Sequence, residues 1–197
     1  MNEKLNRLVN EVQKRQTYKD GDGHQAILDI CYDEWNRPEN KDWSYADMVS
    51  YAKIMFGPFA EMMILLGKYN HQVCNGGHDQ YFTNGYADTN GGGCFADHSH
   101  DVPLHKRTMK LMQKFGLDKT KLGKEVYDIQ SKFVRLTRVA WERERADEDR
   151  YDEPVYDEID TRYFKINEEW EVFLRNYAND VLAGRIDLDK EENNATA

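Results

Sequence analysis

The sequence lacks the long apolar run that a membrane-spanning helix requires. No stretch of its 197 residues approaches the ~20 consecutive apolar side chains needed to cross a bilayer. The first residues, Met1 to Leu5, are mostly polar and are followed by neither an apolar signal region nor a cleavage site. We therefore expect a protein that is neither inserted in a membrane nor secreted.

Cysteine and proline are also scarce. The three cysteines, Cys31, Cys74 and Cys94, are an odd number in a chain without a secretion signal, so we expect no disulfide framework. Reduced thiols are the ordinary state in the cytosol, and we expect a cytoplasmic protein. Only four prolines interrupt the chain, and no stretch shows the alternation of apolar and polar residues that is typical of a strand. The sequence therefore predicts an all-α protein.

Positive charge is in deficit. Lys and Arg total 27 against 36 Asp and Glu, which gives a formal net charge of −9. A surface of this sign repels nucleic acids and anionic membranes and attracts basic proteins. The charge is unevenly distributed: residues 104–124 carry seven Lys or Arg against one Asp, and residues 147–160 carry eight Asp or Glu against one Arg. We expect no direct binding of nucleic acid or membrane, and a basic protein as partner.

Apolar residues, by contrast, are abundant and recur at intervals of three and four, as on one face of a helix. This pattern predicts helices over residues 5–12, 27–35, 44–57, 58–76, 103–116, 121–143 and 159–181. Ser44 and Asp47 have the spacing of a capping box, and Gly76-Gly77 is a natural helix stop. The stretch before those glycines is apolar on nearly all sides, which is typical of a buried helix.

We thus predict a single compact domain of about seven helices around a buried central helix. Within it we distinguish an N-terminal helical extension over residues 1–40, a main all-α domain over residues 41–185 and a polar tail over residues 186–197. No internal repeat is visible.

Histidine and cysteine are concentrated between residues 71 and 105. Imidazole and thiolate are ligands that zinc prefers. The candidate ligands are His71, Cys74, His78, Cys94, His98 and His100. Their spacing is that of neither a zinc finger nor a His-Glu-x-x-His helix, so we expect no metal and no cofactor. A metal-dependent enzyme that uses this cluster stays open as an alternative.

The second candidate functional region is an acidic segment. Its carboxylates are Asp147, Glu148, Asp149, Asp152, Glu153, Asp157, Glu158 and Asp160. Acidic residues in the first turn of a helix stabilise its dipole, and a run of them is ordinarily a solvated face. The same run also has the charge needed to imitate the phosphate row of a nucleic acid and to attract a basic groove.

Two motifs carry a resemblance to a known family. Asn75-Gly76-Gly77-His78-Asp79-Gln80-Tyr81-Phe82 follows the apolar helix, and Tyr156-Asp157-Glu158-Ile159-Asp160-Thr161-Arg162-Tyr163-Phe164 is an acidic helix start with paired aromatics. Over residues 45–180 the chain resembles a bacterial domain-of-unknown-function family that includes a DNA-mimic protein. The resemblance implies an all-α fold, a homodimer and an acidic surface that occupies the groove of a DNA-binding protein. We interpret the first motif itself as structural, because its glycines permit left-handed backbone and its aromatics suit the core.

Three functional hypotheses follow. The first is a non-enzymatic DNA mimic that binds and inhibits or regulates a transcription factor, a nuclease or a host-defence complex, through the eight carboxylates of the acidic segment. The second is the metal-dependent enzyme. The third is an immunity-type or scaffold protein that binds one partner through shape, with the acidic residues serving solubility.

Overall fold

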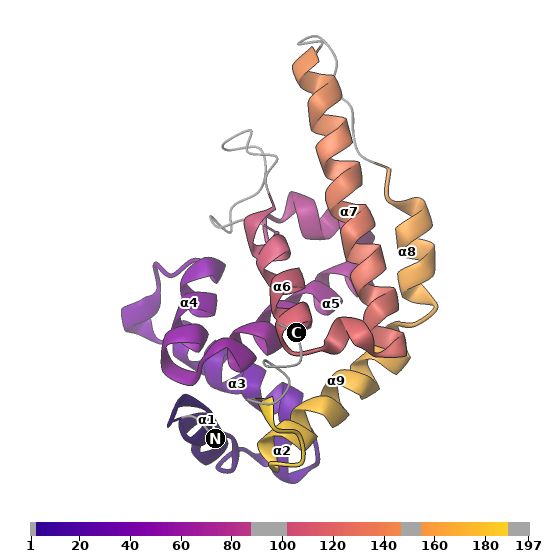
Figure 1. Cartoon of the computed structure of the whole chain (residues 1–197). Helices are drawn as coiled ribbons and strands as arrows, with labels where there is room; N and C mark the ends of the chain where they lie inside the picture. The colour runs from indigo at the N-terminus through magenta and orange to yellow at the C-terminus, as the bar shows by residue number, and fades with distance from the viewer. Residues whose placement is uncertain (1–2, 88–101, 147–154, 189–197) are drawn as a thin grey trace.

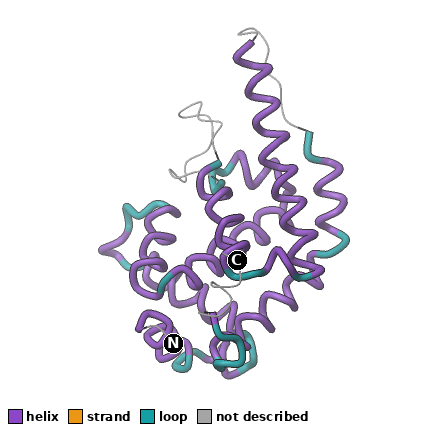
Figure 2. Tube along the Cα trace, in the orientation of Figure 1, coloured by secondary structure: helices purple, strands orange, loops and turns teal. Residues whose placement is uncertain are grey.

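The computed structural model describes residues 3–87, 102–146 and 155–188, and over this part of the chain it is helical throughout (Figures 1 and 2). The described residues contain nine α-helices and no strand, which confirms the all-α prediction. The helices are α1 (Glu3–Val12), α2 (Gln16–Lys19), α3 (Gly23–Trp35), α4 (Tyr45–Phe56), α5 (Pro58–Thr83), α6 (Pro103–Lys114), α7 (Lys121–Ala146), α8 (Asp157–Phe164) and α9 (Asn167–Leu182).

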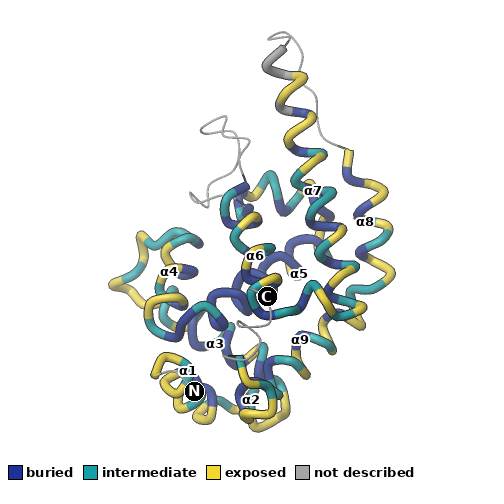
Figure 3. The backbone as a smooth tube through the Cα atoms, in the orientation of Figure 1, coloured by how far each residue is buried: buried dark blue, intermediate teal, exposed yellow. Residues whose placement is uncertain are grey.

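The central helix is α5, as the sequence predicts. Every residue from Phe59 to Asn70 is buried, and α5 packs against α3, α4, α6, α8 and α9 (Figures 1 and 3). A helix enclosed on all sides must be apolar around its whole circumference, which explains the lack of a polar face in this stretch.

Local sequence sets where α4 and α5 begin. The Ser44 hydroxyl accepts from the Asp47 backbone N–H at 3.2 Å, and the Asp47 carboxylate accepts from the Ser44 backbone N–H at 2.8 Å. This capping box is the one predicted. Gly57 then takes a φ of +89°, which separates α4 from α5, and Pro58 occupies the first turn of α5.

The predicted stop at Gly76-Gly77 is a break within α5 rather than its end. Gly76 has φ −166° and Gly77 has φ +73°, so neither residue is helical, and a further helical piece follows to Thr83. The chain therefore changes direction at the glycines, as their sequence suggests, and then resumes the helix.

Two further differences raise the helix number above the predicted seven. The short α2 was not predicted, and the last predicted helix is two helices, α8 and α9. The turn between them lets Ile159 and Tyr163 pack beside α5 and α7, whereas Trp170 and Leu174 pack beside α3 and α5. One straight helix could not bury both pairs against these different neighbours.

The segment that we distinguished as an N-terminal extension contributes to the same core as the rest. Leu8, Val12, Ile27 and Cys31 are fully buried and belong to one cluster with the apolar side chains of α5 and α9. Among the described residues, no helix combines the length and the apolar character needed to cross a membrane.

Candidate functional site

The two signature motifs lie against each other. Asp160, on α8, accepts a hydrogen bond from the His78 backbone N–H at 2.9 Å and contacts His78 Nδ1 at 2.5 Å. A Cβ on Gly77 would come within 2.5 Å of Asp160 Oδ2, so only glycine leaves room for the carboxylate. Asp160 thus receives the first free N–H of the helical piece that resumes after the break, as a capping side chain does.

The imidazole of His78 is fully buried and uses both nitrogens. Nδ1 contacts Asp160, and Nε2 lies 2.7 Å from the hydroxyl of Tyr69, which is itself fully buried. Burial lowers the pKa of His78, because a charged imidazolium is poorly solvated there, although its bond to Asp160 opposes the shift. A neutral ring that donates to Asp160 and accepts from Tyr69 satisfies both contacts. This chain of hydrogen bonds has no access to solvent at His78 or Tyr69, and we assign it a structural role.

A second buried histidine, His105, lies beside the first. Its ring contacts Phe133 edge-on, its Nδ1 lies 3.3 Å from the Tyr81 hydroxyl and its Nε2 lies 3.4 Å from the Gln130 carbonyl oxygen. Burial, aided by the nearby His78, lowers the pKa of His105 to about 3. His105 is therefore a neutral core residue, and both its nitrogens have protein partners.

The remaining described members of the histidine and cysteine concentration do not converge. The Cys74 thiol contacts Asn70 Oδ1 at 3.6 Å and accepts from Asn167 Nδ2 at 3.4 Å, and burial raises its pKa. His71 is exposed on α5. No group of three His, Cys, Asp or Glu among the described residues could hold a metal ion. Cys94, His98 and His100 lie outside the described residues.

The acidic residues predicted as a binding surface have different positions. Asp157 and Glu158 are exposed in the first turn of α8. Asp160 faces His78 and its side chain is 20% exposed. Its carboxylate therefore binds a core residue and does not belong to an exposed row of acids. Asp147, Glu148, Asp149, Asp152 and Glu153 lie outside the described residues.

Basic side chains of α7 and α8 border the exposed acidic turn. Lys132 forms an ion pair with Glu158 and lowers the pKa of that carboxyl group. Arg162 donates two hydrogen bonds to Glu125, at 2.8 and 3.0 Å. The negative charge of Glu158 is therefore balanced by Lys132. Among the described residues, no ion pair is found for Asp157, the other exposed acid in this turn.

Exposed apolar side chains lie on α8 and α9 and just before α8. Phe164 is 47% exposed at the end of α8 and Val172 is 49% exposed on α9, while Val155 is 70% exposed just before α8. Single exposed apolar residues are ordinary on a protein surface. Together with Asp157, they give the α8–α9 surface a mixed acidic and apolar character.

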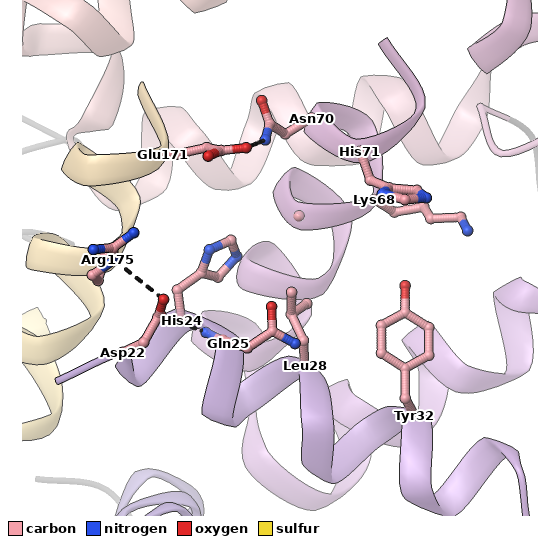
Figure 4. A pocket seen from close by; sticks show the side chains of 11 residues that line it. Asp22, His24, Gln25, Leu28, Tyr32, Lys68, Asn70, His71, Glu171 and Arg175 are labelled. Atoms are coloured by element: carbon pink, nitrogen blue, oxygen red, sulfur yellow. Dashed lines mark hydrogen bonds and ion pairs between the residues drawn. The ribbon is translucent and has the colours of Figure 1, made fainter. Parts of the chain in front are cut away.

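A cavity of about 510 Å³ lies between α3, α5 and α9 (Figure 4). Two polar pairs form one part of its wall: Arg175 contacts Asp22 at 3.1 Å, and Asn70 Nδ2 donates to Glu171 at 2.7 Å. His24 Nε2 lies 3.1 Å from the Met63 carbonyl oxygen, and burial lowers its pKa. The sequence analysis missed this cavity, although the polar residues Lys68 and Asn70 within an otherwise apolar helix were a visible signal of it.

No protein-family model, no curated protein and no solved structure matches this chain.

Proposed function

We propose that this protein is a non-enzymatic binding protein whose acidic segment takes the place of DNA in the groove of a basic protein. The observation that carries the proposal is the exposure of Asp157 and Glu158 at the start of α8. These two carboxylates directly follow five others in the sequence, at residues 147–153, with a single arginine among them. Such a density of negative charge attracts a groove that normally neutralises phosphates.

The chemistry of the two fully buried histidines supports binding over catalysis. His78 and His105 are fully buried, and each nitrogen of both rings has a protein partner. Neither ring has a free nitrogen to bind a metal or to exchange a proton with a substrate. The metal-dependent enzyme would have to depend on residues outside the described part of the chain.

The exposed apolar residues favour a second form of binding. Phe164 and Val172 provide the apolar contact that protein interfaces bury at their centre. If they dominate, the protein is the immunity-type or scaffold protein, which recognises its partner by shape. Salt distinguishes the two forms, because screening weakens charge attraction and leaves apolar contact nearly unchanged.

The test compares two variants that each remove four negative charges. The first changes Asp149, Asp152 and Asp157 to Asn and Glu153 to Gln. The control changes Glu3 and Glu39 to Gln and Asp20 and Asp42 to Asn, all on the N-terminal elements away from α8. Partners are captured from host lysate on immobilised wild-type protein, identified, purified and titrated against each variant at low and high salt, with and without duplex DNA.

We expect the first variant to bind the partner at least tenfold more weakly, a loss of about 1.4 kcal/mol, while the control binds as the wild type does. Duplex DNA should compete, and the affinity should fall as salt rises. Equal loss in both variants would indicate net charge alone. Unchanged binding in the first variant, with no competition by DNA, would contradict mimicry. Light scattering during the same work measures whether the chain is the homodimer that the resemblance implies.

A further inference from the structure

The cavity between α3, α5 and α9 is built by residues that serve no role in the acidic surface. α3 contributes His24, Leu28 and Tyr32, spaced one helical turn apart. Gly67 on α5 faces them: a Cβ there would lie 2.9 Å from Leu28 Cδ2 and 3.1 Å from His24 Nε2. The glycine therefore lets the two helices approach closely beside the cavity.

Lys68 is the unusual residue of this cavity. Its side chain is on the central helix, and the residue is only 9% exposed. Its Nζ lies 4.0 Å from the centroid of the Tyr86 ring, a cation–π contact. Among the described residues the structure gives this ammonium no carboxylate, carbonyl or hydroxyl acceptor, so its three N–H donors are unused.

The other charged residue buried on α5 is treated differently. Glu61 is 3% exposed and accepts two hydrogen bonds of 2.9 Å from Arg107. A charge taken from water into a helix core requires such a partner, because desolvation otherwise costs several kcal/mol. Within the described part of the chain, Lys68 has only an aromatic ring as a partner, and it lines a cavity large enough to admit one more.

Two further donors lie at the same end of the cavity. The Tyr32 hydroxyl points toward Lys68, and His71 lies beside Lys68 on the next turn of α5 (Figure 4). Burial raises the pKa of Tyr32 to about 12, so its hydroxyl keeps its proton. We infer that this end of the cavity binds the carboxylate or phosphate group of a small organic anion, with Lys68 as its ion partner and Tyr32 as a second donor.

The opposite end indicates what the rest of that molecule is. Asp22 is held in place by Arg175 and by the Gln25 backbone N–H, and Glu171 is held by Asn70. Each carboxylate still has lone pairs that can accept from hydroxyl groups. Leu28 is the only aliphatic side chain in the lining. A hydroxyl-rich molecule fits this wall better than an apolar one, and the volume is that of a site for a small molecule. The ligand is therefore a phosphorylated or carboxylated sugar.

The experiment uses three probes that share one pyranose ring and differ only at C6: glucose 6-phosphate, glucuronate and glucose. Isothermal titration of the wild-type chain at low salt should show binding of one or both anions and at least tenfold weaker binding of neutral glucose. The anion that binds more tightly identifies the head group as phosphate or carboxylate. Lys68→Met, which keeps the length of the side chain without its charge, should weaken binding at least tenfold. Lys110→Met, at an exposed position on α6, should keep it within twofold.

Wild-type protein provides a readout that does not depend on the folding of a variant. Addition of the bound anion should shift the backbone NMR signals of residues around Tyr32, Lys68 and His71 and leave those of α8 unchanged. Tyr32→Phe, which removes one hydroxyl, should weaken binding at least threefold. The inference is overturned if neither anion binds more tightly than glucose, if Lys68→Met folds and binds as the wild type does, or if the shifts lie elsewhere. Because none of these measurements involves the acidic segment, their outcome is independent of the proposed function.

Discussion

At the scale of single residues, Asp160 joins two segments that lie 82 positions apart in the chain. Its carboxylate receives the His78 backbone N–H and the His78 ring, and it fits only because Gly77 has no side chain. The sequence analysis placed Asp160 on an acidic surface. In the structure, Asp160 instead holds the break in α5 against α8. The same contact accounts for Gly77 and His78 in the first motif and for Asp160 in the second.

The first prediction separates this contact from backbone conformation. Gly77 and Gly21 both have positive φ, +73° and +90°, but a Cβ on Gly21 would meet nothing within 4 Å. Gly21→Ala should lower the free energy of unfolding by about 1 kcal/mol, the cost of left-handed backbone. Gly77→Ala should lower it by at least about 1 kcal/mol more, because it also displaces a partly buried carboxylate from its hydrogen bonds to His78.

Urea unfolding of both variants and of the wild type measures the difference. Equal losses at the two positions would show that the Asp160 contact contributes nothing beyond the backbone. A Gly77→Ala variant of wild-type stability would contradict the structural assignment of the motif altogether.

At the scale of elements, buried histidines lie where α5, α6 and α7 meet. The rings of His78 and His105 both contact Phe133 of α7, and Tyr69 of α5 contacts both. Burial lowers the pKa of each imidazole in the folded state. In the unfolded chain the same groups return to a pKa of about 6.5. The unfolded state therefore binds more protons below pH 6.5, and stability falls as the pH falls.

The second prediction concerns this pH dependence. With a folded pKa of about 3, His105 alone should remove about 2 kcal/mol from the free energy of unfolding between pH 7 and pH 5. His105→Phe keeps a ring in place and removes the titration, so its stability should fall by about 2 kcal/mol less over that range.

Urea titrations at pH 7, 6 and 5 check it. If His105→Phe and the wild type lose stability in parallel, His105 is not the neutral buried group that the structure describes.

At the scale of the whole molecule, the two ends of the described chain are joined. Asn179 of α9 accepts from the Gly23 backbone N–H at 2.8 Å and donates to the Gly21 carbonyl oxygen at 2.7 Å. Arg175 of the same helix pairs with Asp22. These contacts link the start of α3 to α9, and the Asp22–Arg175 pair lines the same cavity as Lys68. Residues 1–40 are thus continuous with the core and help to build the cavity.

The third prediction follows from that continuity. A chain that begins at residue 41 lacks the buried Leu8, Val12, Ile27 and Cys31 and exposes the surfaces of α5 and α9 that they cover. Burial of each large aliphatic side chain contributes about 1.5–3 kcal/mol. The loss of Leu8, Val12 and Ile27 alone is therefore comparable with the whole stability of an ordinary domain, about 5–15 kcal/mol. The truncated chain should show no cooperative thermal unfolding by circular dichroism, whereas the full chain should show a helix-dominated spectrum and a single transition. A cooperative transition in the truncated chain would establish residues 1–40 as a separate extension.

The helical class, the buried central helix and several helix ends follow from the amino-acid sequence without knowledge of the fold. The spacing of apolar residues and the capping of a helix depend on residues close together in the chain. The mostly apolar circumference of α5 and the Ser44–Asp47 capping box can therefore be predicted from the sequence.

The tertiary structure alone decided which polar residues face inward. Asp160 belongs to an acidic run, and Lys68 to a helix that is otherwise mostly apolar, yet the first binds His78 and the second lines a cavity. Neither position follows from spacing, because the partners come from segments far away in the chain. The charge of a side chain does not show whether it is solvated or faces inward. That depends on whether a protein group is placed to replace water as its partner, and only the fold supplies that group.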